Sequence, residues 1–152
     1  MVNGRGAGGA AALALWAVAS CSGSSQDIAT GPLSGRIGGK PWTLVAAETD
    51  SFLSTPDELS VTMYGETVAP CAGTAPSSDA LILGVPSAPG DYALGLSRSA
   101  TFYIADRNQN LVTDYGRLRV DAVTATAITG GANIQFDNDS TVSGQFQVTI
   151  CP

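Results

Sequence analysis

Carboxylates and cysteines are the side chains of this sequence that could take part in catalysis or metal binding, because the chain contains no histidine. It therefore lacks the usual acid–base residue of neutral pH and the commonest metal ligand, and it cannot build a triad that needs an imidazole. Two carboxylates alone can still hydrolyse a glycosidic bond. The acids that could supply such a pair are Glu48, Asp50, Asp57, Glu58 and Glu66. Nothing in their spacing shows that two converge, so we expect a protein that is not an enzyme and keep a carboxylate-dependent envelope hydrolase as an alternative.

Two polar stretches contain residue types that bind metal ions, but both are better explained as turns. Asp106, Asn108 and Asn110 are spaced like the first ligands of a calcium loop, but the glycine and the final glutamate of that loop are missing. The run Asp137-Asn138-Asp139 brings carboxylates together, yet these residue types are also preferred in turns. We predict a polar turn at each place, no metal site and no cofactor.

The charge of the chain excludes further classes of partner. Its formal net charge is −6 and its isoelectric point is about 4.2. A nucleic-acid surface needs clustered lysine and arginine, and anionic lipid attracts basic rather than acidic segments. We therefore expect no nucleic-acid partner and no electrostatic adsorption to a membrane.

The segment 1–20 has the composition of an export signal. Arg5 and the amino group make its start positive, and Ala10 to Ala19 form an apolar run. This run is too short for a transmembrane helix, which needs about 20 apolar residues, and it matches the apolar region of a signal peptide. We predict a signal-peptide helix over residues 1–20.

The sequence Val18-Ala19-Ser20-Cys21 that ends this segment resembles the lipobox of bacterial lipoproteins. The resemblance implies that Cys21 carries a diacylglycerol, that the chain is cut before it, and that the protein is anchored to a membrane of the cell envelope. It also implies, from Ser22, the outer rather than the inner membrane. An ordinary cleaved secretion signal and a retained helix are the alternatives.

Residues 21–32 are predicted to be the acylated cysteine and a flexible tether, because they are small, polar and without period. An edge strand is the alternative for this stretch. The remaining residues, 33–152, are expected to form one domain that positions the candidate side chains.

The hydrophobic pattern of residues 33–152 has period two, which predicts half-buried strands. No helical period is evident there, although Thr55-Pro56-Asp57-Glu58 resembles a helix start. We predict an all-β domain, an antiparallel β-sandwich or a small β-barrel of about eight or nine strands. The expected strands are 33–38, 42–49, 58–64, 79–85, 91–96, 99–105, 116–124, 126–136 and 141–150.

Cys71 and Cys151 remain once Cys21 is assigned to lipid. Two cysteines in an exported domain most simply form a disulfide, with two free thiols as the alternative. Such a long closed loop contributes about 4 kcal/mol in the chain-entropy treatment. Ile150 has inward parity, so Cys151 falls on the outward side or just past the strand, and the bridge is predicted at the rim.

Three aromatic residues are candidates for ligand contact: Trp42, Tyr64 and Tyr103. The two tyrosines have the opposite parity to their apolar neighbours, which predicts an outer sheet face. An exposed aromatic strip can stack on a sugar ring or a partner protein. Ordinary cross-strand packing is the alternative.

Several short motifs give the domain a resemblance to small β-sandwich domains of bacterial lipoproteins. They are Gly38-Gly39-Lys40-Pro41-Trp42, Glu58-Leu59-Ser60-Val61, Leu83-Gly84-Val85-Pro86, Pro89-Gly90-Asp91-Tyr92 and the run from Val142 to Cys151. The resemblance implies fold and location and no activity. We therefore expect a lipid-anchored envelope protein with a structural or binding role, whose partner is an envelope protein or a glycan. A carbohydrate- or peptide-binding module that uses exposed aromatics is the first alternative.

Overall fold

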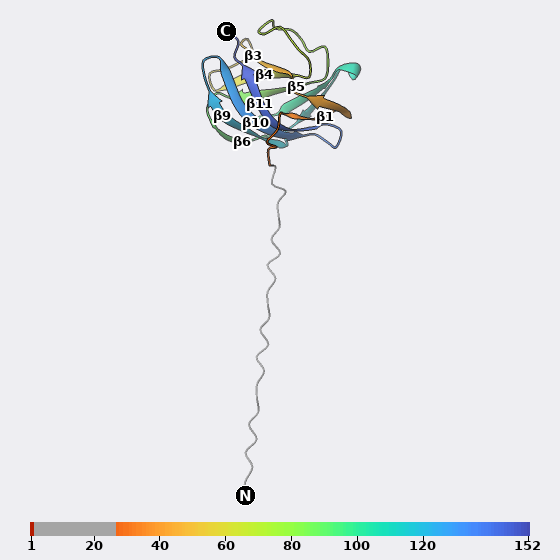
Figure 1. The fold of residues 1–152 in the computed structure, drawn as a ribbon, viewed down its shortest axis with the longest axis vertical. Coiled ribbons are helices and arrows are strands. Elements are labelled where there is room, and N and C mark those ends of the chain that lie inside the picture. Colours follow the sequence, from red (N-terminus) through yellow and green to blue (C-terminus); the bar gives the residue numbers. More distant parts are fainter. Residues whose placement is uncertain (2–26) are drawn as a thin grey trace.

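The structure is a computed structural model that describes Met1 and residues 27–152. The predicted signal-peptide helix and Cys21 lie outside the described residues. The described part of the chain is all-β, as predicted, with one short 3-10 helix, η1 (Ala105–Arg107) (Figure 1). The strands are β1 (Ser34–Ile37), β2 (Lys40–Thr43), β3 (Ala46–Asp50), β4 (Glu58–Tyr64), β5 (Ala80–Pro86), β6 (Gly90–Ala93), β7 (Ala100–Ile104), β8 (Gln109–Thr113), β9 (Gly116–Val123), β10 (Ala127–Gln135) and β11 (Thr141–Thr149).

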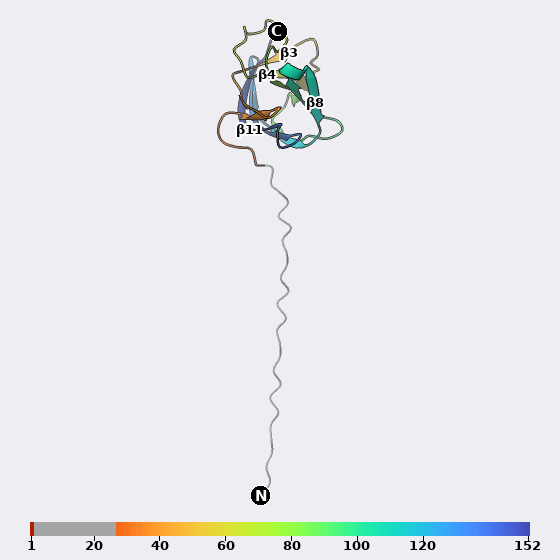
Figure 2. The same cartoon turned by 90° about the vertical axis from the view of Figure 1, so that its right-hand side faces the viewer.

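All these strands belong to one strongly curled sheet that forms a half-barrel (Figures 1 and 2). The strand order is β6-β9-β10-β11-β3-β4-β5-β7-β8, with β1 beside β11 and β2 beside β1. The predicted antiparallel pairing holds for every pair except one. β3 and β11 run parallel and are joined at a single position, Glu48 opposite Thr149. The sheet is therefore mixed, and this junction links its two halves.

The expected strand 42–49 is in fact two strands. Leu44 and Val45 separate β2 from β3, and their amides bond to different parts of the sheet. The Leu44 N–H donates to the carbonyl of Leu33, and the Val45 N–H donates to that of Tyr64. The chain thus passes here from one half of the sheet to the other, which hydrophobic alternation alone does not reveal.

Two further expectations differ from the structure. The edge strand β8 was not predicted, because its residues do not alternate cleanly and Val112 is exposed. Residues 55–58 form a tight loop rather than a helical turn. The Thr55 hydroxyl accepts the Glu58 N–H at 3.1 Å, and the chain enters β4 directly at Glu58.

The core lies inside the curl of the sheet. In β11 the buried residues alternate with exposed or half-buried ones, which confirms the alternation predicted for the last strand. The largest fully buried side chain is Phe102 of β7, and it shares the core with Met63, Leu118 and Ile134 from other strands. No helix in the described residues is long and apolar enough to cross a membrane.

Candidate functional site

The outer faces of β3 and β4 carry the polar residues of the candidate site. Ala47 of β3 faces the core, so its neighbours Glu48 and Ala46 face outward. On β4, Tyr64 and Thr62 lie opposite Ala46 and Glu48. These strands therefore place a carboxylate, a phenol and a hydroxyl on one patch of sheet.

A long connection folds over this patch. Residues 65–79 join β4 to β5 and are called here the clasp. The Tyr64 hydroxyl donates to the Thr74 carbonyl of the clasp at 3.0 Å. The Cys71 N–H donates to Glu48 Oε2 at 2.7 Å. The clasp thus buries both Tyr64 and Glu48, which are 3% and 6% exposed.

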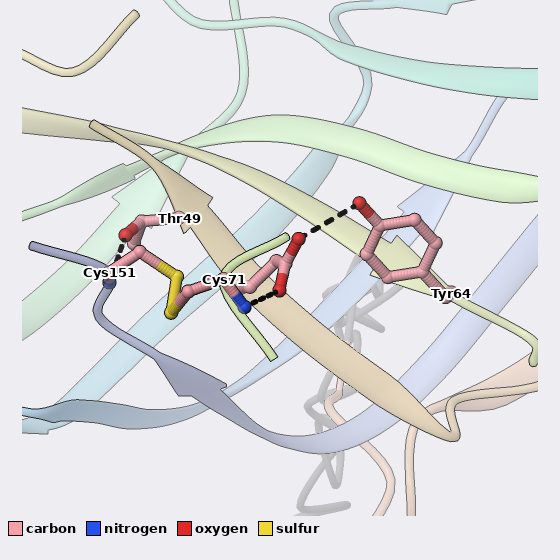
Figure 3. Close-up of a disulfide and its surroundings, with 5 residues drawn as sticks. Thr49, Tyr64, Cys71 and Cys151 are labelled. Atoms are coloured by element: carbon pink, nitrogen blue, oxygen red, sulfur yellow. Dashed lines mark hydrogen bonds between the residues drawn. A yellow bond between two sulfur atoms is a disulfide. The ribbon is translucent and has the colours of Figure 1, made fainter. Parts of the chain in front are cut away.

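The disulfide between Cys71 and Cys151 fixes the clasp to the end of β11 (Figure 3). The structure brings the two predicted cysteines to bonding distance at the rim of the sheet, just past the last strand, as the parity argument placed them. The Cys151 N–H also donates to Thr49 Oγ1 at 2.8 Å. Cys71 has a left-handed backbone, with φ 57°, and the Glu48 carboxylate holds its amide in that conformation.

Tyr64 is kept as a hydrogen-bond donor by its surroundings. Burial raises the pKa of its phenol, and the nearby Glu48 carboxylate raises it further. The hydroxyl also lies 3.4 Å from Glu48 Oε1. Its single proton serves one acceptor at a time, and the shorter contact is the one to Thr74.

A cavity of about 410 Å³ opens between the clasp, β3 and the disulfide, and is called here the rim cavity. Its polar lining includes Glu48, Asp50, Thr62 and Tyr64, and it contains no lysine or arginine. A second cavity, of about 320 Å³, lies between β3, the clasp and β11. Both border on Glu48, and the second is also lined by Gln147 and Thr149 of β11.

Glu48 and Asp50 are the two candidate acids that the structure brings into one cavity. Glu48 accepts the backbone amide of Cys71. Asp50 Oδ1 accepts the amides of Phe52 and Leu53 at 2.9 and 3.3 Å, and so closes the turn after β3. Each carboxylate thus has a backbone partner, an arrangement that stabilises loops.

The other candidate acids lie elsewhere. Glu58 forms an ion pair with Arg98 at 2.8 Å. Glu66 ties the two ends of the clasp together, because its carboxylate accepts hydrogen bonds from the amides of Ser77 and Ser78 and from the Ser77 hydroxyl. The hydrogen bond from Ser77 lowers the pKa of Glu66 below its ordinary value. Asp57, outside the rim cavity, accepts the Ser87 amide through its backbone carbonyl.

The prediction of an exposed aromatic strip is wrong for Trp42 and Tyr64. Trp42 is 6% exposed, because β2 turns its ring into the core, where its Nε1–H donates to the Asp79 carbonyl at 2.9 Å. Tyr64 does lie on the outer face, as its parity predicted, but the clasp covers it. Tyr103 is half-buried on β7, and its hydroxyl lies 3.4 Å from Asn108 Oδ1.

The two polar stretches form turns, as predicted. Asp106 pairs with Lys40, which lowers the pKa of that carboxyl, while Asn108 has a left-handed backbone that ends η1. Asp137 Oδ1 accepts the amides of Asp139 and Ser140 at 2.9 and 2.7 Å. Among the described residues, the group with metal-ligand geometry is Glu48 with Cys71 and Cys151, whose atoms lie within 4.8 Å of one another. Its sulfurs are bonded together, so neither offers a thiolate.

Sequence reasoning missed the clasp and the burial of Glu48. The signal that could have found them is the length of the connection between two confidently expected strands, 65–79, since long connections in compact domains commonly have a role of their own. The presence of Cys71 in this connection is a second signal.

We expect the double variant Cys71→Ser/Cys151→Ser to unfold more easily than the oxidised protein. The bridge spans 80 residues, and its loss lowers the free energy of unfolding by about 4 kcal/mol in the chain-entropy treatment. Urea unfolding of the full chain measures this difference, with Cys21→Ser as the matched cysteine control. Equal unfolding midpoints for the double variant and the control would contradict a stabilising bridge.

The clasp should loosen in acid. A carboxyl whose pKa is lowered in the folded state contributes stability above its unfolded pKa, and this contribution is lost as the pH falls through the folded value. The amides of Ser77 and Ser78 should therefore be protected from hydrogen exchange at pH 7 and lose that protection below the ordinary carboxyl range. The Glu66→Gln variant serves as the control, because hydrogen exchange of its Ser77 and Ser78 amides should show no acid-dependent step. A step of the same size in this variant would assign the effect to another carboxyl.

Comparison of the chain with models of protein families, with curated proteins and with solved structures finds no match in any of the three. Its function is therefore inferred from its own residues.

Proposed function

We propose that this protein is a lipid-anchored component of the bacterial cell envelope with a non-catalytic structural or binding role. The observation that supports the proposal best is the use of its three cysteines. Cys71 and Cys151 are bonded to each other, and the third, Cys21, stands in the lipobox-like sequence Val18-Ala19-Ser20-Cys21. Lipidation of Cys21 would thus account for the one cysteine that the disulfide leaves over.

The arrangement of the domain supports the non-catalytic part of the proposal. Glu48 and Asp50 share the rim cavity, but both serve backbone amides. A hydrolase that uses two carboxylates needs one of them as a proton donor and the other as a base or nucleophile. Both carboxylates already serve as acceptors for loop amides, which suits a structural role.

We expect Cys21→Ser to abolish membrane anchoring in the bacterium that expresses the full chain. The thioether that carries the lipid cannot form on serine, and two or more acyl chains are what make such anchoring stable. Labelling with a fatty-acid probe and separation of membranes by density would measure this. The wild-type protein should take up label and band with the outer membrane.

The matched control is Cys71→Ser/Cys151→Ser, which should keep the label. Labelling that persists in Cys21→Ser would overturn lipidation at this residue. Labelled protein found only in the inner membrane would overturn the outer-membrane assignment that Ser22 suggests.

A carbohydrate-binding module is a second, more specific candidate, and the rim cavity favours it. Its volume of about 410 Å³ and its hydroxyl and carboxylate lining suit a small hydroxyl-rich ligand such as a sugar residue. This replaces the aromatic strip as the contact surface. A glycan array of bacterial cell-wall sugars would test it with the full chain.

Asp50→Asn should weaken the binding of a sugar that the array identifies at least tenfold. The asparagine keeps the oxygen that accepts the Phe52 amide, so the turn remains while the charge is lost. The control is Asp121→Asn on the surface of β9, outside the rim cavity. Equal binding by the two variants would show that the sugar does not occupy the rim cavity.

A further inference from the structure

The described part of the predicted tether is not free. Residues 27–29 are bonded by side chains on the outer face of β10 and β11, and residues 31–33 pair through their backbone with Gln145 of β11 in a parallel bridge. Five hydrogen bonds hold the segment. Their donors and acceptors are Asn133 Nδ2 to the Asp27 carbonyl, the Ala29 N–H to Ser143 Oγ, Gln145 Nε2 to the Ala29 carbonyl, the Gln145 N–H to the Gly31 carbonyl and the Leu33 N–H to the Gln145 carbonyl. The bond lengths are 2.7 to 3.0 Å.

Glycines make room for this segment. A Cβ on Gly131 would lie 2.7 Å from Ile28 Cγ2, and a Cβ on Gly144 would lie 2.4 Å from the Pro32 carbonyl oxygen. Gly144 also has φ 146°, a backbone conformation that other residues rarely adopt. Any larger side chain at either position would push the segment off the sheet.

The side chain that binds the segment is itself held in place. Gln145 Oε1 accepts a hydrogen bond from Arg119 Nη2 at 2.9 Å. This contact orients the Gln145 amide so that Nε2 donates to the Ala29 carbonyl. Arg119 in turn bonds to Asp121 at 2.7 Å. The outer face of β9, β10 and β11 is thus organised around residues 27–32, and this surface is called here the tether dock.

We propose that the tether dock holds the folded domain against the surface of the membrane that anchors it, with the rim cavity turned away from the lipid. This proposal rests on the proposed lipidation of Cys21. Five residues separate Cys21 from Asp27, and an extended chain of that length reaches about 20 Å at most. Without the dock the free chain would extend to Leu33, the first buried residue, and would reach about 40 Å.

Charge supports the need for such a device. The net charge of −6 disfavours adsorption to anionic lipid, so proximity to the membrane depends on the dock rather than on attraction. Figures 1 and 2 show the coloured chain beginning at the end of the domain opposite to its C-terminus. The rim cavity is bordered by the C-terminus and therefore faces away from the lipid.

The test uses the lipidated mature protein in vesicles that contain a dansyl-labelled phospholipid. The sequence has two tryptophans. Cleavage of the predicted signal peptide removes Trp16, so Trp42 is the energy donor in the mature chain. We expect efficient transfer from Trp42 to the lipid label in the wild-type protein. Gly131→Val should reduce transfer at least twofold and should increase hydrogen exchange of the Ala29 amide at least tenfold.

Two controls keep the result interpretable. Thr129→Val changes an exposed residue of the same strand and should leave both readouts unchanged. Insertion of ten Gly and Ser residues after Ser25 leaves the dock intact and should lower transfer without changing exchange at Ala29. This insertion tests membrane proximity even where Gly131→Val fails to fold.

The outcomes separate the dock from the anchor. A protein that does not float with vesicles, while its Ala29 amide remains protected, would refute lipidation and leave the dock in place. Unchanged transfer in the insertion variant, with the protein bound to vesicles, would overturn the proposed proximity. Unprotected Ala29 in the wild-type chain would overturn the dock itself.

Discussion

The junction between β3 and β11 is the constraint on which the rest of the structure depends. It is the place where the two halves of the half-barrel join, and its ladder consists of one parallel bridge between Glu48 and Thr149. Two contacts reinforce it: the hydrogen bond from the Cys151 amide to Thr49, and the disulfide through the clasp. Glu48 serves the junction twice, since its backbone forms the bridge and its carboxylate positions Cys71.

The same sparse pairing explains where the second cavity lies. A full ladder would bring β3 and β11 into continuous contact, whereas one bridge leaves room for the second cavity beside Gln147 and Thr149. The clasp then covers the gap without filling it. The rim cavity lies between β3, β4 and the clasp. The site is therefore a product of topology and of one long connection, rather than of a motif in the sequence.

The sequence predicted those features that depend on local pattern. Strand 58–64 and the alternation of the last strand follow from the two-residue repeat of side chains across a sheet, and the turn at Asp137 follows from the preference of that side chain for local amides. Cys71 and Cys151 were predicted as a pair by elimination, and their place at the rim followed from parity.

Features that depend on distant segments could not be predicted. Parity placed Tyr64 outside the sheet, but whether the outside is wet depends on the path of residues 65–79. Trp42 was misjudged because the chain changes partners at Leu44, which ends β2 with the ring turned into the core. The composition of residues 27–32 is that of a linker, and their binding depends on glycines and polar side chains of β10 and β11, about one hundred positions away.

The junction also distributes the entropic cost of folding unevenly. Most ladders on either side of it join strands that are near neighbours in the chain, such as β3 with β4 or β10 with β11. The bridge from Glu48 to Thr149 instead closes a loop of 149 − 48 = 101 residues. Loop-closure entropy grows with separation and slows the formation of non-local contacts. The half-barrel therefore combines local ladders with long-range pairings of β11 with β3 and with β1, and these pairings are expected to form more slowly than the local ladders.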